Sequence, residues 1–147
     1  MRQIFIGSDH AGFEVKSFLL EYLSQKYQEF NVVDCGTSSS ERTNYAIYAH
    51  NLSKSLQNSQ ENHCGILICG SGIGVSIVAN RYKGIRAALI YNEKIAELSR
   101  QHNDANVACF GARFFSVNEI KDMVEIFLST PFLGGTHLER VQNIESL

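Results

Sequence analysis

Long apolar runs are missing from this 147-residue sequence. No stretch approaches the roughly 20 apolar residues that a membrane-spanning helix needs, so we expect no membrane contact. The chain has no large excess of positive or negative charge. Its net charge of −2 gives no reason to expect nucleic acid as a partner. Low-complexity segments and internal repeats are also absent. With 44% apolar and 19% charged residues, the composition predicts one globular domain over residues 1–147.

The sequence also lacks the signs of secretion and of a metal site. Met1–Phe5 leads directly into an apolar strand-like run, which leaves no room for a signal peptide. The four cysteines, Cys35, Cys64, Cys69 and Cys109, are therefore expected to be free thiols in the cytoplasm. No pair of cysteines or histidines has the spacing of a strong zinc motif. We expect neither a metal nor a cofactor.

The stretch Gly65–Gly74, Gly-Ile-Leu-Ile-Cys-Gly-Ser-Gly-Ile-Gly, resembles a strand followed by a glycine-rich turn. Its run Ile66–Ile68 is typical of a strand buried on both faces, and Cys69 stands at the carboxyl end of that run. The turn leads into an apolar stretch that can begin a helix, so backbone N–H groups and the positive end of a helix dipole would meet there. We expect this turn to attract an anion and to favour the reactive thiolate form of Cys69. The alternative is a small buried cysteine that merely packs at a strand end.

Three familiar loop types are excluded by the residue that follows these glycines. The dinucleotide-binding fingerprint needs a third glycine at position 75, where this chain has Val75. A P-loop needs lysine followed by serine or threonine after the last glycine, and a cysteine phosphatase loop needs arginine at position 75. What remains is an anion-binding turn that carries a cysteine.

Strand-like and helix-like segments alternate five times along the chain. Strands are predicted at Gln3–Ser8, Asn31–Asp34, the run ending at Cys69, Arg86–Ile90 and Val107–Phe110. Helices are predicted from Val15 to about Lys26, over Ala46–Leu56, from Val75 to about Tyr82, from an Asn92 cap to near His102, after a Ser116–Glu119 capping box, and over Leu138–Ile144. A loop is expected at Cys35–Thr43 and a polar connection at Asn58–His63.

This alternation predicts an α/β fold, a Rossmann-like three-layer sandwich with a five-stranded parallel sheet flanked by helices. The expected strand order is 2-1-3-4-5. That order places the ends of the first and third strands side by side at the switch point, where such sheets bind ligands. Asp9 and His10 would then share one crevice with Cys69 and Ser71.

Polar groups also collect at three other predicted element ends, in the segments Ser99–Asp104, Gly111–Arg113 and Gly134–Arg140. Each has an ordinary structural explanation when taken singly, such as His102 acting as a helix C-cap or Arg113 as a solvated loop cation. Their combination is more informative. A thiolate and an imidazole move protons near neutral pH, a ring of N–H groups stabilises an oxyanion, and arginine suits phosphate. Those are the requirements of an aldose–ketose isomerase that acts on a small phosphorylated sugar.

Two motifs carry a specific resemblance to a known family. Cys-Gly-Ser-Gly-Ile-Gly at Cys69–Gly74 and Arg-Gln-His-Asn-Asp-Ala-Asn-Val at Arg100–Val107 resemble the ribose-5-phosphate isomerase B family, which also contains the galactose-6-phosphate isomerase subunits. The similarity runs from Met1 to about Ile144. It implies interconversion of D-ribose 5-phosphate and D-ribulose 5-phosphate through a cis-enediolate, in the pentose phosphate pathway. It also implies a homodimer or a dimer of dimers, with the site shared across the dimer interface.

The resemblance further implies a role for each matching residue. Cys69 would be the base that moves a proton between C1 and C2, and Ser71 would assist proton exchange between the two oxygens. His102 would be the acid that opens the furanose ring, with Asp9 and Tyr45 near the ring oxygen. The expected enediolate-binding residues are Gly70, Gly72, Ile73, Gly74 and Asn103. The expected phosphate-binding residues are His10, Arg113, His137 and Arg140, with Thr136 at the same cluster.

The chain departs from the family pattern at three positions. Asn44 stands where aspartate is usual, and Ala46 where proline is usual, on either side of Tyr45. Thr136 stands where an arginine of the phosphate cluster is expected. Two other functions remain open from the sequence: an isomerase for a six-carbon sugar phosphate, such as allose or galactose 6-phosphate, and a non-catalytic sugar-phosphate-binding module.

Overall fold

Five parallel strands form the centre of the molecule. The computed structural model describes residues 1–59 and 62–146, so the predicted connection Asn58–His63 includes two residues, 60 and 61, that lie outside the described residues. The strands are β1 (Arg2–Ser8), β2 (Phe30–Asp34), β3 (Cys64–Cys69), β4 (Ala87–Leu89) and β5 (Val107–Gly111). Every strand pairing is parallel, which confirms the predicted sheet type.

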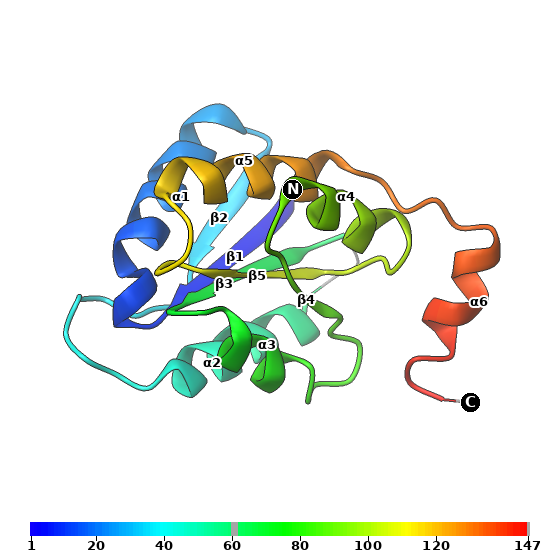
Figure 1. Ribbon diagram of the computed structural model, residues 1–147, viewed down its shortest axis with the longest axis horizontal. Coiled ribbons are helices and arrows are strands. Elements are labelled where there is room, and N and C mark those ends of the chain that lie inside the picture. The colour runs from blue at the N-terminus through cyan, green and yellow to red at the C-terminus, as the bar shows by residue number, and fades with distance from the viewer. Residues whose placement is uncertain (60–61, 147) are drawn as a thin grey trace.

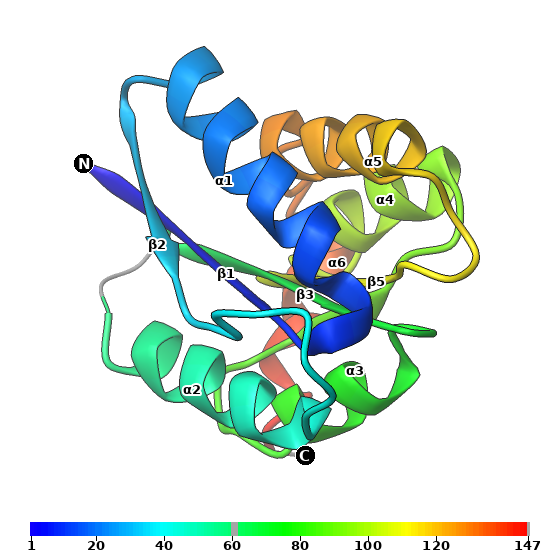
Figure 2. The ribbon, with the colours of Figure 1, turned by 90° about the vertical axis from the view of Figure 1, so that its left-hand side faces the viewer.

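Helices cover both faces of this sheet and give the predicted three layers (Figure 1 and Figure 2). The helical elements are a 3-10 turn η1 (His10–Gly12), α1 (Phe13–Lys26), α2 (Tyr45–Gln57), α3 (Ile73–Ala79), α4 (Glu93–Gln101), α5 (Val117–Ser129) and α6 (Thr136–Gln142). Figure 1 shows α1, α4 and α5 above the sheet and α2 and α3 below it, with α6 set apart at one end. None of the helices described is long and apolar enough to cross a membrane.

Alternation along the strands divides the core between the two faces. Ile66 and Ile68 of β3 face the core shared with α1 and α5, whereas Leu67 between them faces α2 and α3. Because side chains alternate along a strand, a continuous apolar run can supply both layers at once. This explains why the central strand carries no polar residue between Cys64 and Cys69.

The predicted order of the last two strands is wrong. The sheet order is β2-β1-β3-β5-β4, so β5 lies beside β3 and β4 forms the edge. The physical reason is burial: all five residues of β5 are buried, whereas β4 has three residues that are only half-buried. A short, partly exposed strand suits an edge, and the unbroken apolar run of β5 requires cover on both faces.

The helix boundaries also refine the prediction. α3 begins at Ile73 and ends at Ala79, one turn short of the predicted end near Tyr82, because residues 80–82 continue in tight turns. α6 begins at Thr136 and ends at Gln142, earlier at both ends than predicted. The predicted caps are confirmed: Asn92 accepts the Ile95 N–H, and Ser116 and Glu119 form a capping box.

Chain direction assigns each polar segment to one of two ends of the sheet. We call the end where the parallel strands finish the carboxyl edge and the end where they begin the amino edge. The turns after β1, β3 and β5 lie at the carboxyl edge. α4 starts beyond the carboxyl end of β4 and must return to the amino edge before β5 begins at Val107. The segment after α4 therefore lies at the amino edge. Figure 1 agrees, because the start of α1, which follows β1, lies at the end of the sheet opposite to α6.

Candidate active site

Cys69 ends β3 inside the glycine-rich turn. Its side chain is only 5% exposed, and its Sγ accepts a hydrogen bond of 3.1 Å from the Gly72 N–H. Gly72 has φ of 80°, a left-handed conformation that glycine adopts without strain, and it is the N-cap of α3. Ser71 Oγ accepts the Ile73 N–H at 3.2 Å. The turn thus directs one backbone N–H, that of Gly72, at the sulfur atom of Cys69.

The other three thiols differ from Cys69 in their surroundings. Burial raises the pKa of Cys35 to about 11 and also raises the pKa of Cys64 and of Cys109. These three groups stay protonated near neutral pH, so they are poor bases and poor nucleophiles. Among the described hydrogen bonds, Cys69 is the cysteine whose sulfur accepts a backbone N–H, that of Gly72.

Asp9 and His10 follow β1 and lie beside the Cys69 turn, because β1 and β3 are neighbours. Asp9 is buried, and its Oδ1 accepts the N–H groups of Ala11 and Gly12 at 3.0 and 3.3 Å, which caps η1. His10 Nδ1 accepts the Thr43 N–H at 3.1 Å. Since a backbone N–H can only donate, Nδ1 has no hydrogen and Nε2 of the neutral ring is the donor.

Tyr45 and Arg113 flank the turn. A Cβ atom on Gly74 would come within 2.4 Å of the Tyr45 ring, so that ring lies directly against the first turn of α3. A Cβ atom on Gly70 would come within 3.0 Å of Arg113 Nη1, so the guanidinium lies over the turn from the side of β5. The Arg113 N–H also donates to the Gly70 carbonyl at 3.1 Å. The structure therefore brings together the expected site residues Asp9, His10, Tyr45, Cys69, Gly70, Ser71, Gly72, Ile73, Gly74 and Arg113.

A fully buried lysine supports the loop beside this cluster, and sequence reasoning missed it. Lys16 of α1 is 1% exposed and donates to Asp34 Oδ1 at 2.8 Å. The same carboxylate oxygen accepts the Gly36 N–H at 2.9 Å, and Gly36 in turn pairs with Ser8 of β1. The available signal was the helical spacing of Lys16 with Leu19 and Leu23, which puts it on the buried face.

The remaining expected residues gather around the end of α4 and the start of α6. His102 is the C-cap residue of α4, and its ring stacks on the ring of His137 with centroids 4.3 Å apart and an interplanar angle of 11°. The two rings line a cleft of about 300 Å³ together with Asn103, Arg140, Val141 and Ile144. Thr136 is the exposed first residue of α6.

Desolvation lowers the pKa of His137, and the nearby His102 and Arg140 lower it further. The imidazole of His137 is therefore mostly neutral at pH 7. In that state it offers hydrogen bonds to a ligand rather than a positive charge, and Arg140 is the fixed cation of this cleft.

One chain does not unite the two groups of expected residues. Cys69 lies at the carboxyl edge, and the His102 segment lies at the amino edge, separated by the length of the sheet. Six residues of β3 span roughly 17 Å, which no hydrogen bond bridges. Within one chain, the two groups therefore do not form a single site.

The described residues show no cluster of three or more histidine, cysteine, aspartate or glutamate side chains that could hold a metal ion. The imidazoles and the carboxylate nearest the expected site instead make the hydrogen bonds and the stacking contact given above. The chemistry that this arrangement offers is proton transfer near an oxyanion-binding turn, with arginine and histidine nearby for an anionic group.

Comparison with known proteins identifies the family. The profile of the Ribose/Galactose Isomerase family matches residues 4–144. The chain is 44% identical to the probable ribose-5-phosphate isomerase B of Mycoplasma pneumoniae over 96% of this chain and 91% of that protein. It is 41% identical to ribose-5-phosphate isomerase B of Escherichia coli over 100% of this chain and 97% of that protein.

Solved structures agree with the sequence comparison. The crystal structure of ribose-5-phosphate isomerase B from Mycoplasma genitalium with bound ribulose-5-phosphate superposes with a TM-score of 0.92 at 40% identity, and the match covers 97% of this chain and 93% of that chain. The sequence match and the fold both extend over nearly the whole chain. The protein therefore belongs to the ribose/galactose isomerase family.

Proposed function

We propose that the protein is a ribose-5-phosphate isomerase, which interconverts D-ribose 5-phosphate and D-ribulose 5-phosphate in the pentose phosphate pathway. The observation that carries the proposal is the position of Cys69, a thiol at the carboxyl end of the central strand whose sulfur accepts the Gly72 N–H. Support comes from relatives that bear this name over nearly the full chain, one of them with ribulose-5-phosphate bound.

Proton transfer between C1 and C2 is the role proposed for Cys69. Its thiolate removes the C2 proton of open-chain ribose 5-phosphate, the electron pair forms the enediolate C=C bond, and the carbonyl oxygen becomes an oxyanion. The same sulfur then returns the proton to C1 and leaves the ketose. The N–H groups of Gly70–Gly74 stabilise the negative charge as it develops, and Ser71, whose Oγ lies beside the Ile73 N–H, relays a proton between the two oxygens.

Ring opening is the role proposed for His102, because a furanose must become an aldehyde before its C2 proton is acidic. Protonation of the ring oxygen by an imidazole near neutral pH is ordinary general-acid catalysis. Asp9 and Tyr45, which flank the Cys69 turn, would lie near the ring oxygen. Asn103, directly after His102, adds an amide donor for the enediolate oxygens.

Phosphate binding is proposed for one group of side chains from each edge. His10 offers an Nε2–H donor because its Nδ1 is occupied, and Arg113 lies across Gly70. Arg140 and His137 border the cleft at the amino edge. Arginine is well suited to this task because its planar fork binds phosphate oxygens in pairs.

A homodimer is part of the proposal, because the two groups of residues lie at opposite edges of one chain. A symmetric pair would place the partner's His102 near Cys69 and create two equivalent sites. Exposed apolar side chains on α3, Ile73 and Ile77, give such a pair a surface beside the turn. We also propose a cytoplasmic location, where a reducing environment keeps Cys69 as a thiol.

A turnover assay tests this function. The purified protein is given D-ribose 5-phosphate and, separately, D-allose and D-galactose 6-phosphates. The pentose should have the highest kcat/KM, and EDTA should leave the activity unchanged. Cys69→Ala should lower turnover by about 10²–10⁴ and still bind the sugar phosphate, while Cys35→Ala serves as the matched control. Preference for a hexose phosphate, or full activity of Cys69→Ala, would overturn the proposal.

A further inference from the structure

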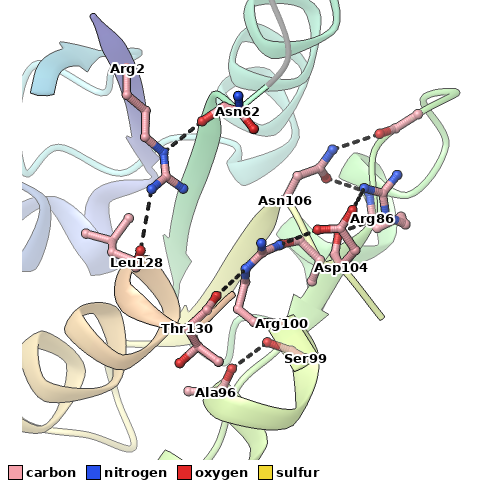
Figure 3. Close-up of polar contacts among 12 residues, drawn as sticks. Arg2, Asn62, Arg86, Ala96, Ser99, Arg100, Asp104, Asn106, Leu128 and Thr130 are labelled. Atoms are coloured by element: carbon pink, nitrogen blue, oxygen red, sulfur yellow. Dashed lines mark hydrogen bonds and ion pairs between the residues drawn. The ribbon is translucent and has the colours of Figure 1, made fainter. Parts of the chain in front are cut away.

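Asp104 occupies the centre of an ion-pair network two residues after the expected acid His102. Its Oδ1 accepts a hydrogen bond of 2.9 Å from Arg100 Nη1, and its Oδ2 accepts one of 3.3 Å from Arg86 Nη2. Its backbone carbonyl accepts Arg86 Nε at 2.8 Å, and its N–H donates to the Arg100 carbonyl. Figure 3 shows Asp104 between the two arginines.

Asp104 has an unusual backbone conformation, and the network helps to stabilise it. Its φ of 46° is left-handed, a conformation that costs most residues free energy but that aspartate and asparagine tolerate. That conformation reverses the chain between α4 and β5 within a few residues. Asn106 completes the turn, because its Oδ1 accepts the Arg86 N–H at 2.7 Å and its Nδ2 donates to the Gly84 carbonyl at 2.8 Å.

Arg100 connects this turn to the segment that leads to α6. Its Nε donates to the Thr130 carbonyl at 3.2 Å, next to the end of α5, and its guanidinium lies 5.7 Å from the centre of the Phe127 ring. A second contact joins the same segments, because the Leu133 N–H donates to the Gln101 carbonyl at 3.1 Å. The side chain of Arg100 is only 16% exposed, so solvent screens its contacts weakly.

The network therefore holds both members of the stacked histidine pair. His102 lies between two anchored residues, Gln101 and Asp104, and His137 is carried by the segment that Arg100 and Gln101 attach to α4. The rings meet at 4.3 Å only if the turn and α6 keep these positions. The carboxylate of Asp104 has no contact with the cleft residues beyond this turn among the described hydrogen bonds, so it acts through others.

We propose that Asp104, together with Arg86 and Arg100, is a positioning residue that fixes His102 and Asn103 for catalysis. This inference rests on the proposed function. It assigns the Asp104 carboxylate no contact with the sugar phosphate. Its effect comes from geometry, because a displacement of about 1 Å in a catalytic group can cost about 10²-fold in rate.

Asp104→Asn is the most informative variant. Asparagine keeps the size of the side chain and tolerates the left-handed backbone, but it has one acceptor oxygen and turns an NH₂ group toward the other guanidinium. We expect kcat on ribose 5-phosphate to fall about 10- to 100-fold. KM should change less than kcat, because His10 and Arg113 bind the phosphate from the other end of the strands and lie outside this network. The rate at which iodoacetamide alkylates Cys69 should equal that of the wild type.

Two further variants keep the test decisive. Arg100→Lys loses the fork that joins Asp104 and Thr130, and it should also lower kcat. Asp122→Asn removes a carboxylate from an exposed ion pair on α5 with Lys121 and should change nothing. Circular dichroism at the assay temperature gives the folded fraction of each variant.

The outcomes distinguish a failure of the proposed function from a failure of the positioning role of Asp104. If the wild type does not isomerise ribose 5-phosphate, the proposed function fails. If the wild type is active and both network variants keep its kcat, the positioning role fails while the function stands. A fall in kcat that only matches a loss of folded protein also overturns the positioning role, because a purely structural residue would behave in that way.

Discussion

The ring of His137 lies flat against the ring of His102, and this contact has a consequence for stability. Desolvation, with the nearby His102 and Arg140, lowers the pKa of His137 from its ordinary value of 6.5. The folded protein therefore binds a proton at this position less readily than the unfolded chain does. By linkage, the folded state loses stability as the pH falls below about 6.5.

Replacing this histidine should reveal the effect. The melting temperature of wild type relative to His137→Gln should fall between pH 7.5 and pH 5.5, because only the wild type must keep an imidazole neutral there. The melting curves are compared at both pH values, with His50→Gln on the exposed face of α2 as the control. An equal difference at the two pH values would contradict the pKa assignment.

Thr136 stands where the family pattern has an arginine, so at this position the chain offers the phosphate of its proposed substrate a weaker partner. A hydroxyl offers one neutral hydrogen bond, whereas an arginine offers a charge-assisted fork, and hydrogen bonds to charged groups contribute roughly 1.5–3 kcal/mol. That corresponds to about a 10- to 100-fold change in affinity. Thr136→Arg should lower KM for ribose 5-phosphate with little change in kcat, because phosphate is held alike in the ground and transition states. Steady-state kinetics with an unchanged or raised KM would refute this role for position 136.

At the scale of elements, the glycine-rich turn and α3 form one unit with Tyr45. Gly74 lies in the first turn of α3, where alanine is the better helix former by roughly 1 kcal/mol, yet a methyl group there would collide with the Tyr45 ring at 2.4 Å. The Tyr45 side chain is 41% exposed and can swing away. Local helix propensity and the site therefore make opposite demands on position 74.

Gly74→Ala should accordingly fold as well as the wild type but lose activity. We expect a melting temperature equal to or above that of the wild type and a raised KM for ribose 5-phosphate, because Tyr45 no longer lies over the turn. Val78→Ala, in the last turn of α3, is the matched control for a small change in the same helix. A lower melting temperature together with an unchanged KM would show that the contact matters for folding alone.

Sequence patterns were sufficient for most elements and for the Cys69 turn. The apolar run Ile66–Ile68, the Ser116 capping box and the Asn92 cap each depend on residues close in sequence, and the structure confirms them. The order of β4 and β5 was not accessible in this way, because it depends on which strand the helices bury on both faces. The Lys16–Asp34 pair and the Arg86–Asp104 contact each join residues that are 18 positions apart in the sequence, and no short sequence motif predicts them.

At the scale of the whole molecule, the two edges of the sheet carry different parts of the expected chemistry. The carboxyl edge holds the thiol, the glycine-rich turn and Arg113. The amino edge holds the stacked histidines and Arg140. Neither edge alone has both the proposed base and the proposed acid, so the proposed function requires that two copies of the chain complete each other's sites.

Subunit complementation tests this claim most directly. Cys69→Ala and His102→Asn are purified separately, and each should be nearly inactive on ribose 5-phosphate. After the two are mixed in equal amounts under conditions that exchange subunits, half of the dimers are hybrids, and each hybrid has one site with both Cys69 and His102 intact. Activity should then rise to about a quarter of that of the wild type. If hybrids form, as native mass spectrometry would show, and the mixture stays inactive, the shared site is contradicted.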